Sequence, residues 1–188
     1  MNKHEQAPTI QSDRLSMRSL STADEDFYCS LYTDAEVMRF AGAALSRDVA
    51  TESFRKSLGR MGQSSFERRV VVLLDRATQE PIGISSVRLL RGKPGRAEVG
   101  TLLKPGKHDN GFAQECSTAL ITQAFTRPQI DELVAYSTPG NAAVEGLLTG
   151  LGFSREKSVP PRDGQPERIA WSISRGEWAK RNAGSKSK

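Results

Sequence analysis

The sequence predicts a mixed α/β fold, with a central, mostly antiparallel, twisted sheet of about six to seven strands flanked by helices. Short apolar runs joined by turns recur between residues 70 and 103, which is typical of an antiparallel meander. A strong helical pattern follows at 111–125, and a further strand pattern at 130–137. A strand, a helix and a second strand in this order form a crossover, which predicts one parallel pair in the sheet.

The N-terminal part of the chain predicts one strand and three helices. In the strand, at 15–20, Leu15 and Met17 alternate with polar residues. Ser21 and Asp34 precede the first two helices, and their side-chain oxygens are suited to cap free N–H groups. The second helix is expected at 35–40, and the third from residue 46 or 48 to about 60.

Three strand patterns fill the middle of the chain. Residues 70–74 are continuously apolar, as expected for a strand that is buried on both faces. At 82–90 the apolar alternation changes phase halfway, so we expect a β-bulge near Ser85 and Ser86. The third pattern, at 97–103, leads into the loop before the central helix.

The central helix is predicted to cover the sheet, and the loop before it is predicted to bind an anion. Apolar residues at steps of three and four form one buried face, namely Ala113, Cys116, Leu120 and Ala124. The preceding loop, rich in Lys, Gly and Asn, delivers free backbone N–H groups to the positive end of the helix dipole. Phosphate is the expected guest.

The C-terminal part predicts one helix and two strands. Asn141 is the expected cap of a helix at 142–151, and Gly152 is suited to end it in the left-handed conformation. Strands at 153–157 and 167–173 complete the sheet. The polar loop between them either borders an acceptor site or is simple surface.

Composition indicates one domain in a reducing compartment. With 37% hydrophobic and 26% charged residues, the chain resembles ordinary soluble domains, and we expect a single domain at 9–181 between disordered ends at 1–8 and 182–188. No apolar run is long enough for a membrane span, and no signal peptide precedes the domain. Cys29 and Cys116 are expected to be buried thiols, which fits a cytoplasmic location.

Charge and residue spacing argue against nucleic acid and metal. The net charge is +5, and the last 14 residues contain five Lys or Arg and one Glu, so most of the excess lies in the tail. The rest of the chain has no basic stripe interleaved with aromatic residues. No cluster of His, Cys, Asp and Glu has metal-ligand spacing.

Four segments match a known pattern. They are TIQSDRLSMRSLSTADEDFYCSLYTDAEVMRFAG, AEVGTLLKPGKHDNGFAQECSTAL, TPGNAAVEGLLTGLGF and RIAWSISRGEW. Together they resemble the Gcn5-related N-acetyltransferases (GNAT), and within them the RimJ/RimL-like subgroup, from about residue 9 to 181. The family motif of Arg or Gln, two residues, Gly, one residue and Gly or Ala falls on 108–113. Gly111 and Ala113 match it, whereas His108 and Asp109 depart from the usual residues.

This resemblance implies acetyl-CoA as the acyl-donor cosubstrate. The residues that it places at the cofactor are Thr101, Leu102, Leu103, His108, Asn110, Gly111, Phe112, Ala113 and Asn141. Backbone N–H groups around Leu102 and Leu103 would polarise the thioester carbonyl if this strand splays from its neighbour. Asn141 would contact the pantetheine arm, although a role as helix cap alone explains it equally well.

Attack of an amine on a thioester requires removal of a proton and release of a thiolate. Glu98 is the candidate base, because it matches the Glu-x-Gly pattern of the subgroup at Gly100; a solvated strand carboxylate is the alternative. Tyr136 is the candidate general acid for the leaving thiolate, and ordinary aromatic packing is the alternative.

The resemblance therefore implies an acetyl-CoA-dependent N-acetyltransferase acting on a primary amine, with the α-amino group of a protein or peptide as the first choice. Acetylation of a small amine, an amino acid or an antibiotic stays open. A non-catalytic acyl-CoA-binding or interaction module also stays open, since Asp109 and Val144 stand where the subgroup usually has Gly and Ser. Dimers are common among such relatives, so a homodimer is a further expectation.

Overall fold

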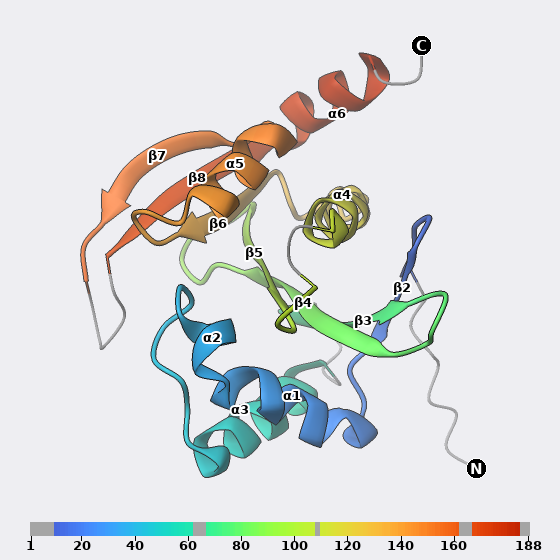
Figure 1. The fold of residues 1–188 in the computed structure, drawn as a ribbon. Helices are drawn as coiled ribbons and strands as arrows, with labels where there is room; N and C mark the ends of the chain where they lie inside the picture. Colours follow the sequence, from blue (N-terminus) through green and yellow to red (C-terminus); the bar gives the residue numbers. More distant parts are fainter. Residues whose placement is uncertain (1–9, 62–66, 108–109, 162–166, 185–188) are drawn as a thin grey trace.

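The computed structural model describes residues 10–61, 67–107, 110–161 and 167–184. In these residues the predicted mixed α/β architecture is confirmed. Eight strands form one sheet in the order β1-β2-β3-β4-β5-β6-β8-β7. Neighbouring strands are antiparallel except for β5 and β6, which run parallel (Figure 1).

The predicted elements occur in the predicted order, and two further elements appear. The strands are β1 (Ile10–Gln11), β2 (Leu15–Ser19), β3 (Arg68–Asp75), β4 (Pro81–Leu89), β5 (Arg96–Leu103), β6 (Glu132–Ser137), β7 (Ser154–Val159) and β8 (Arg168–Ser174). The helices are the short 3-10 turn η1 (Thr22–Asp24), α1 (Glu25–Thr33), α2 (Ala35–Met38), α3 (Arg47–Met61), α4 (Phe112–Phe125), α5 (Ala142–Leu151) and α6 (Arg175–Gly184).

The two unforeseen elements are the edge strand β1 and the helix α6. Helix α6 continues to Gly184, three residues into the segment that the sequence assigns to the tail. Its sequence is polar, but Trp178 is buried in the core and holds the helix against the sheet. Arg175, at the start of α6, donates to carbonyls at the end of α4 and in the loop after it. Such anchors do not produce a periodic apolar pattern, so the sequence carries little signal for this helix.

The caps predicted at Asp34 and Gly152 are confirmed, whereas the Ser21 amide and hydroxyl both donate to the Asp24 carboxylate. The Asp34 carboxylate accepts hydrogen bonds from the amides of Glu36 and Val37 at 2.8 and 3.1 Å, and so starts α2. Gly152 ends α5 with φ of 88°, in the left-handed region that favours glycine.

The β-bulge expected near Ser85 and Ser86 is wrong. The register of β3 and β4 shifts instead between Leu73 and Leu74, opposite Ile82. Ser85 pairs regularly with Val71, yet it is buried on the face of the sheet that α4 covers. The apolar residues therefore change face at Ile82, which packs in the α4-side core, whereas Ile84 packs in the opposite core.

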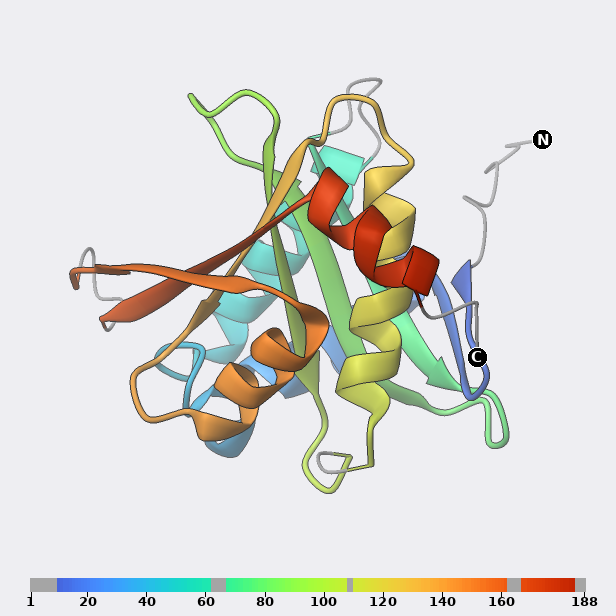
Figure 2. The ribbon, with the colours of Figure 1, turned by 90° about the horizontal axis from the view of Figure 1, so that it is seen from above.

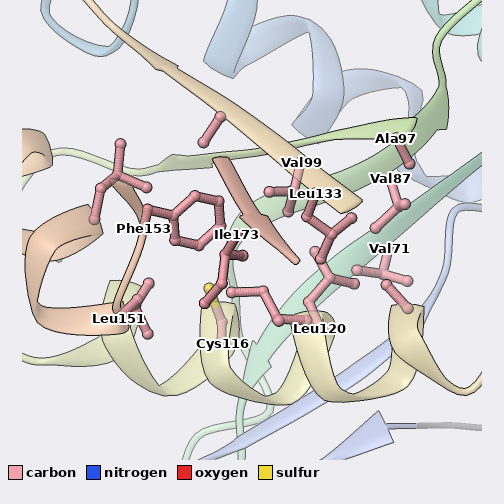
Figure 3. Close-up of a cluster of buried hydrophobic side chains, with 14 of the residues drawn as sticks. Val71, Val87, Ala97, Val99, Cys116, Leu120, Leu133, Leu151, Phe153 and Ile173 are labelled. Carbon is pink, nitrogen blue, oxygen red and sulfur yellow. The ribbon is translucent and has the colours of Figure 1, made fainter. Parts of the chain in front are cut away.

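Helices cover both faces of the sheet. Helices α4, α5 and α6 lie on one face, and α1, α2 and α3 lie on the other (Figure 1). The larger core fills the space between the sheet and α4, where Leu120 and Cys116 of the helix point at Val71, Val99 and their neighbours (Figure 3). The second core lies under α1 and α3 and includes Tyr28.

Both cysteines are buried and free, as predicted. Ser117, next to Cys116 on α4, is also buried. No helix in the described part of the chain is long and apolar enough to cross a membrane.

Candidate active site

Strands β5 and β6 separate partway along their length. Their parallel pairing includes only three residue pairs and ends where Glu98 lies opposite Val134. Beyond that point β5 continues for five more residues, to Leu103, while β6 runs to Ser137. Figure 2 shows the two strands diverging. The sheet is therefore open between them toward their carboxyl ends.

The open segment of β5 presents backbone amides to this gap. At the end of the strand, the Lys104 amide donates to the Ile82 carbonyl of the β4 side at 2.8 Å. Because the direction of amides alternates along a strand, the Leu102 amide also faces β4. The amides of Thr101 and Leu103 face the gap instead. Thr101 and Leu103 thus have the orientation expected of oxyanion donors, and Leu102 does not.

The start of α4 lies beside this gap and has the features of an anion site. Gly111 precedes the helix with φ of 74°, a conformation that favours glycine. The first-turn amides, including those of Phe112 and Ala113, have no partner within the helix. The Lys107 ammonium lies 5.9 Å from the centre of the Phe112 ring and 3.9 Å from the Asp75 carboxylate. His108 lies outside the described residues.

Arg14, which the sequence analysis did not select, holds this helix start in place. Its Nη1 donates to the Asn110 carbonyl at 2.9 Å, and its guanidinium lies 4.7 Å from the centre of the Phe112 ring. Its Nε and its backbone amide each donate to the Glu115 carboxylate at 2.7 Å. A Cβ atom added at Gly111 would lie 3.2 Å from the Arg14 guanidinium. Only the long-range contact reveals this role, since 101 residues separate Arg14 from Glu115.

Asn141 caps α5 on the other side of the gap. Its side-chain oxygen accepts from the Val144 amide at 3.2 Å, so the capping role is confirmed. Its side-chain NH₂ group has no partner among the described residues. It remains able to donate to a ligand that lies along the start of α5.

Glu98 lies at the point where the two strands part. Its side chain is on the sheet face that α1 to α3 cover, away from α4, and Arg88 donates to its Oε2 at 2.6 Å. Glu98 Oε1 has no partner among the described residues. Its side chain is 28% exposed, which leaves room for water at that oxygen.

Tyr136 lies on the same face of β6, two residues beyond Val134 and so level with Gly100 across the gap. The guanidinium carbon of Arg168 lies 4.4 Å from the centre of its ring. A Cβ atom added at Gly100 would meet no atom within 4 Å. The strand register thus places Glu98 and Tyr136 on one sheet face, on the two strands that part here.

The turn after α2 contacts the carboxyl end of β6. The Thr138 hydroxyl, just after β6, donates to the Phe40 carbonyl at 2.6 Å. Phe40 itself is 41% exposed, which is unusual for a large apolar side chain in this chain. The turn after α2 is therefore fastened to the strand that carries Tyr136.

The Thr101 side chain points to the opposite, α4 face. Its hydroxyl is hydrogen-bonded to that of Ser85, and both lie near the Cys116 sulfur, at 3.8 and 3.9 Å. Burial raises the pKa of the Cys116 thiol, so it stays protonated. Thr101 can therefore serve a ligand in the gap through its amide, while its side chain fixes the strand to α4. In the described ranges, no group of three His, Cys, Asp or Glu could hold a metal ion.

Comparison with known proteins gives one family. The model of the acetyltransferase (GNAT) domain matches residues 14–154. An uncharacterized N-acetyltransferase, p20 from Bacillus licheniformis, is 27% identical over 150 residues, which are 79% of this chain and 83% of that protein.

Solved structures share the fold. The spermidine N-acetyltransferase of Vibrio cholerae, in complex with CoA and spermine, has a TM-score of 0.75 and 18% identity, and covers 89% of this chain and 99% of that one. RimL, a ribosomal L7/L12 alpha-N-protein acetyltransferase in complex with coenzyme A, has a TM-score of 0.75 and 13% identity, and covers 89% and 98%.

The contact between Arg14 and Glu115 predicts a pH-dependent stability. Burial raises the pKa of the Glu115 carboxyl, but the hydrogen bonds from Ser12 and Arg14 outweigh it and hold this pKa below its ordinary 4.5. The stabilisation is therefore complete above that ordinary value and is lost as the pH falls through the lower pKa of the folded state. At neutral pH, Glu115→Gln should lower the free energy of unfolding by about 1 to 2 kcal/mol, because Arg14 is half exposed.

Urea unfolding at neutral and acidic pH measures this difference. The gap between wild type and Glu115→Gln should shrink below pH 4.5. Glu145→Gln, in the first turn of α5, is the matched control, since no described side chain binds that carboxylate. Equal losses for both variants would show that only the helix dipole is involved.

Proposed function

The chain belongs to the acetyltransferase (GNAT) domain family, and from this premise we propose that it transfers the acetyl group of acetyl-CoA to a primary amine. One observation carries the proposal. The pairing of β5 and β6 stops at Glu98, which leaves strand amides, a helix start and a carboxylate around a single gap. These are the three groups that acyl transfer from a thioester to an amine requires.

The start of α4 is the proposed site of the CoA diphosphate. The free amides of Phe112 and Ala113 point along the helix axis, and the helix dipole makes this end positive. Arg14 and Lys107 lie beside it, and each is paired with a carboxylate. The glycine at 111 allows a phosphate to approach the backbone. Asn141 is proposed to donate its side-chain NH₂ to an amide oxygen of the pantetheine arm, and Asn110 to lie at the edge of this site.

The gap is the proposed site of the thioester. The amides of Thr101 and Leu103 would stabilise the oxyanion that forms when the amine attacks the carbonyl carbon. Glu98 would accept the amine proton, directly or through a water at Oε1. The new N–C bond forms in this attack, and the C–S bond breaks when the oxyanion collapses to the amide. CoA leaves as a thiolate that Tyr136 can protonate.

The proposed acceptor is the α-amino group of a peptide or protein. The shared fold of RimL, which is named as an alpha-N-protein acetyltransferase, supports this choice. A small amine is the second candidate, because the spermidine N-acetyltransferase shares the fold equally well. Turnover on a set of N-terminal peptides and on small amines such as spermidine separates the two. Binding of CoA without turnover on any amine would favour a non-catalytic module.

Substitution of Gly111 tests the position of the cofactor. Gly111→Trp places a bulky side chain against Arg14 and the first turn of α4. Wild type should gain about 2.7 kcal/mol of stability at acetyl-CoA concentrations of about 100 times the dissociation constant. This gain should vanish in Gly111→Trp, as measured by thermal unfolding with and without acetyl-CoA.

Gly92→Trp is the matched control. Gly92 also has positive φ, 70°, but lies in the turn between β4 and β5, with no atom near its Cβ position. Both variants carry the same backbone strain. If Gly111→Trp keeps the full stabilisation by acetyl-CoA, the cofactor lies elsewhere.

Substitution of Glu98 tests the base. Glu98→Gln should reduce kcat/KM about 10²- to 10⁴-fold at neutral pH and less at high pH, where the amine is already deprotonated. The measurement is the pH–rate profile on whichever amine is turned over. Glu132→Gln is the control, because Glu132 is also an arginine-bound carboxylate on the same sheet face. An unchanged profile in Glu98→Gln would remove Glu98 from this role.

A further inference from the structure

The sheet face around Glu98 and Tyr136 carries an excess of positive charge. Strand register places five cationic side chains and three carboxylates on this face, namely Arg68, Arg88, Arg96, Lys104, Arg168, Glu98, Glu132 and Glu156. All lie on the side that α1 to α3 cover, away from α4. The local charge is opposite to that expected for binding a polycation.

The three carboxylates on this face are each paired with an arginine. Glu98 binds Arg88, and both Glu132 and Glu156 bind Arg96. Two of the remaining cations have aromatic neighbours instead of carboxylates. Lys104 lies 5.1 Å from the centre of the Phe27 ring, and Arg168 stacks on Tyr136.

Arg168 is the cation best placed to meet an acceptor. It lies on β8 beside the carboxyl end of β6, close to the level where Thr138 binds Phe40. Its guanidinium lies over the Tyr136 ring, which covers one side of the guanidinium and leaves its N–H groups for another partner. Among the described residues, no carbonyl or carboxylate accepts from its N–H groups. A half-buried arginine with free N–H groups can bind a carboxylate through two parallel hydrogen bonds.

We propose that the acceptor amine carries a carboxylate a few bonds away, and that Arg168 binds this carboxylate while Glu98 faces the amine. The inference rests on the proposed function, because it names the acceptor class of the same site. The carboxylate can belong to a free amino acid or to an acidic residue near a peptide N-terminus. Both present the same group to the same guanidinium.

Two peptides of equal length test this inference, one beginning Ser-Glu-Glu and one beginning Ser-Gln-Gln. Their dissociation constants are measured by titration calorimetry on the full chain saturated with CoA, so the result does not depend on turnover. We expect the acidic peptide to bind about tenfold or more tightly. Where acetylation is observed, the same preference should appear mainly in KM. Alanine and alaninamide form a second pair, which separates the free amino acid from the peptide.

Arg168→Gln should remove the preference by weakening the acidic peptide to the level of the neutral one. Arg155→Gln is the matched control, since Arg155 is an exposed arginine of the adjacent strand β7 with opposite side-chain direction. Arg168→Lys should restore only part of the preference, because it keeps the charge but not the planar fork.

Equal binding of the two peptides to wild type, with equal binding of alanine and alaninamide, would overturn the inference. A preference that survives in Arg168→Gln would overturn the role of Arg168. Neither result affects the proposed acetyltransferase function, which fails separately if acetyl-CoA and CoA do not stabilise wild type against heat.

Discussion

The arrangement of the site depends on one interruption of backbone pairing, the end of the β5–β6 ladder at Glu98 and Val134. A strand inside a sheet normally bonds to neighbours on both sides, and unpaired amides are costly when buried. Here β4 continues to pair with β5 up to Leu103, so the strand stays extended although β6 has left it. The amides at 101 and 103 are therefore held rigidly toward an open gap, which is the preorganisation that stabilises an oxyanion.

Contacts elsewhere in the fold hold the elements around this gap in position. Helix α4 packs on the sheet through its apolar face, so its N-terminus stays beside the gap. Arg14 ties that N-terminus to the β1–β2 turn through Glu115 and Asn110. On the opposite side, Thr138 ties β6 to the turn after α2. The proposed cofactor side and the proposed acceptor side are thus fixed by separate contacts.

The sequence predicted the fold well where the signal was local. Apolar periodicity located α4, and the caps at Asp34 and Gly152 followed from side-chain chemistry and glycine conformation. Helix α6 was missed because its anchors are tertiary contacts, namely buried Trp178 and the hydrogen bonds from Arg175 to carbonyls at the end of α4 and in the loop after it. The bulge was misplaced because Ile82 and Ile84, which a regular strand would place on one face, pack in opposite cores, which no local pattern reveals.

The same distinction applies to the site. Motif positions predicted Glu98, Gly111 and Asn141 as site residues, and in the structure they lie near the point where β5 and β6 part. Arg14 and Arg168 could not be found in this way, because their partners are distant in the chain or belong to another strand. Only the strand register shows which amides at 101 to 103 face the gap. A shift of the register by one residue would turn the other amides toward it.

Amide hydrogen exchange at residues 101 to 103, followed by NMR with and without acetyl-CoA, tests whether the amides of Thr101 and Leu103 face the thioester site. We expect the Leu102 amide, bonded to β4, to be protected throughout. The Thr101 and Leu103 amides should exchange faster in the free protein and gain protection when acetyl-CoA is added. Uniform protection of all three amides, unaffected by acetyl-CoA, would contradict the assignment of the gap as the thioester site.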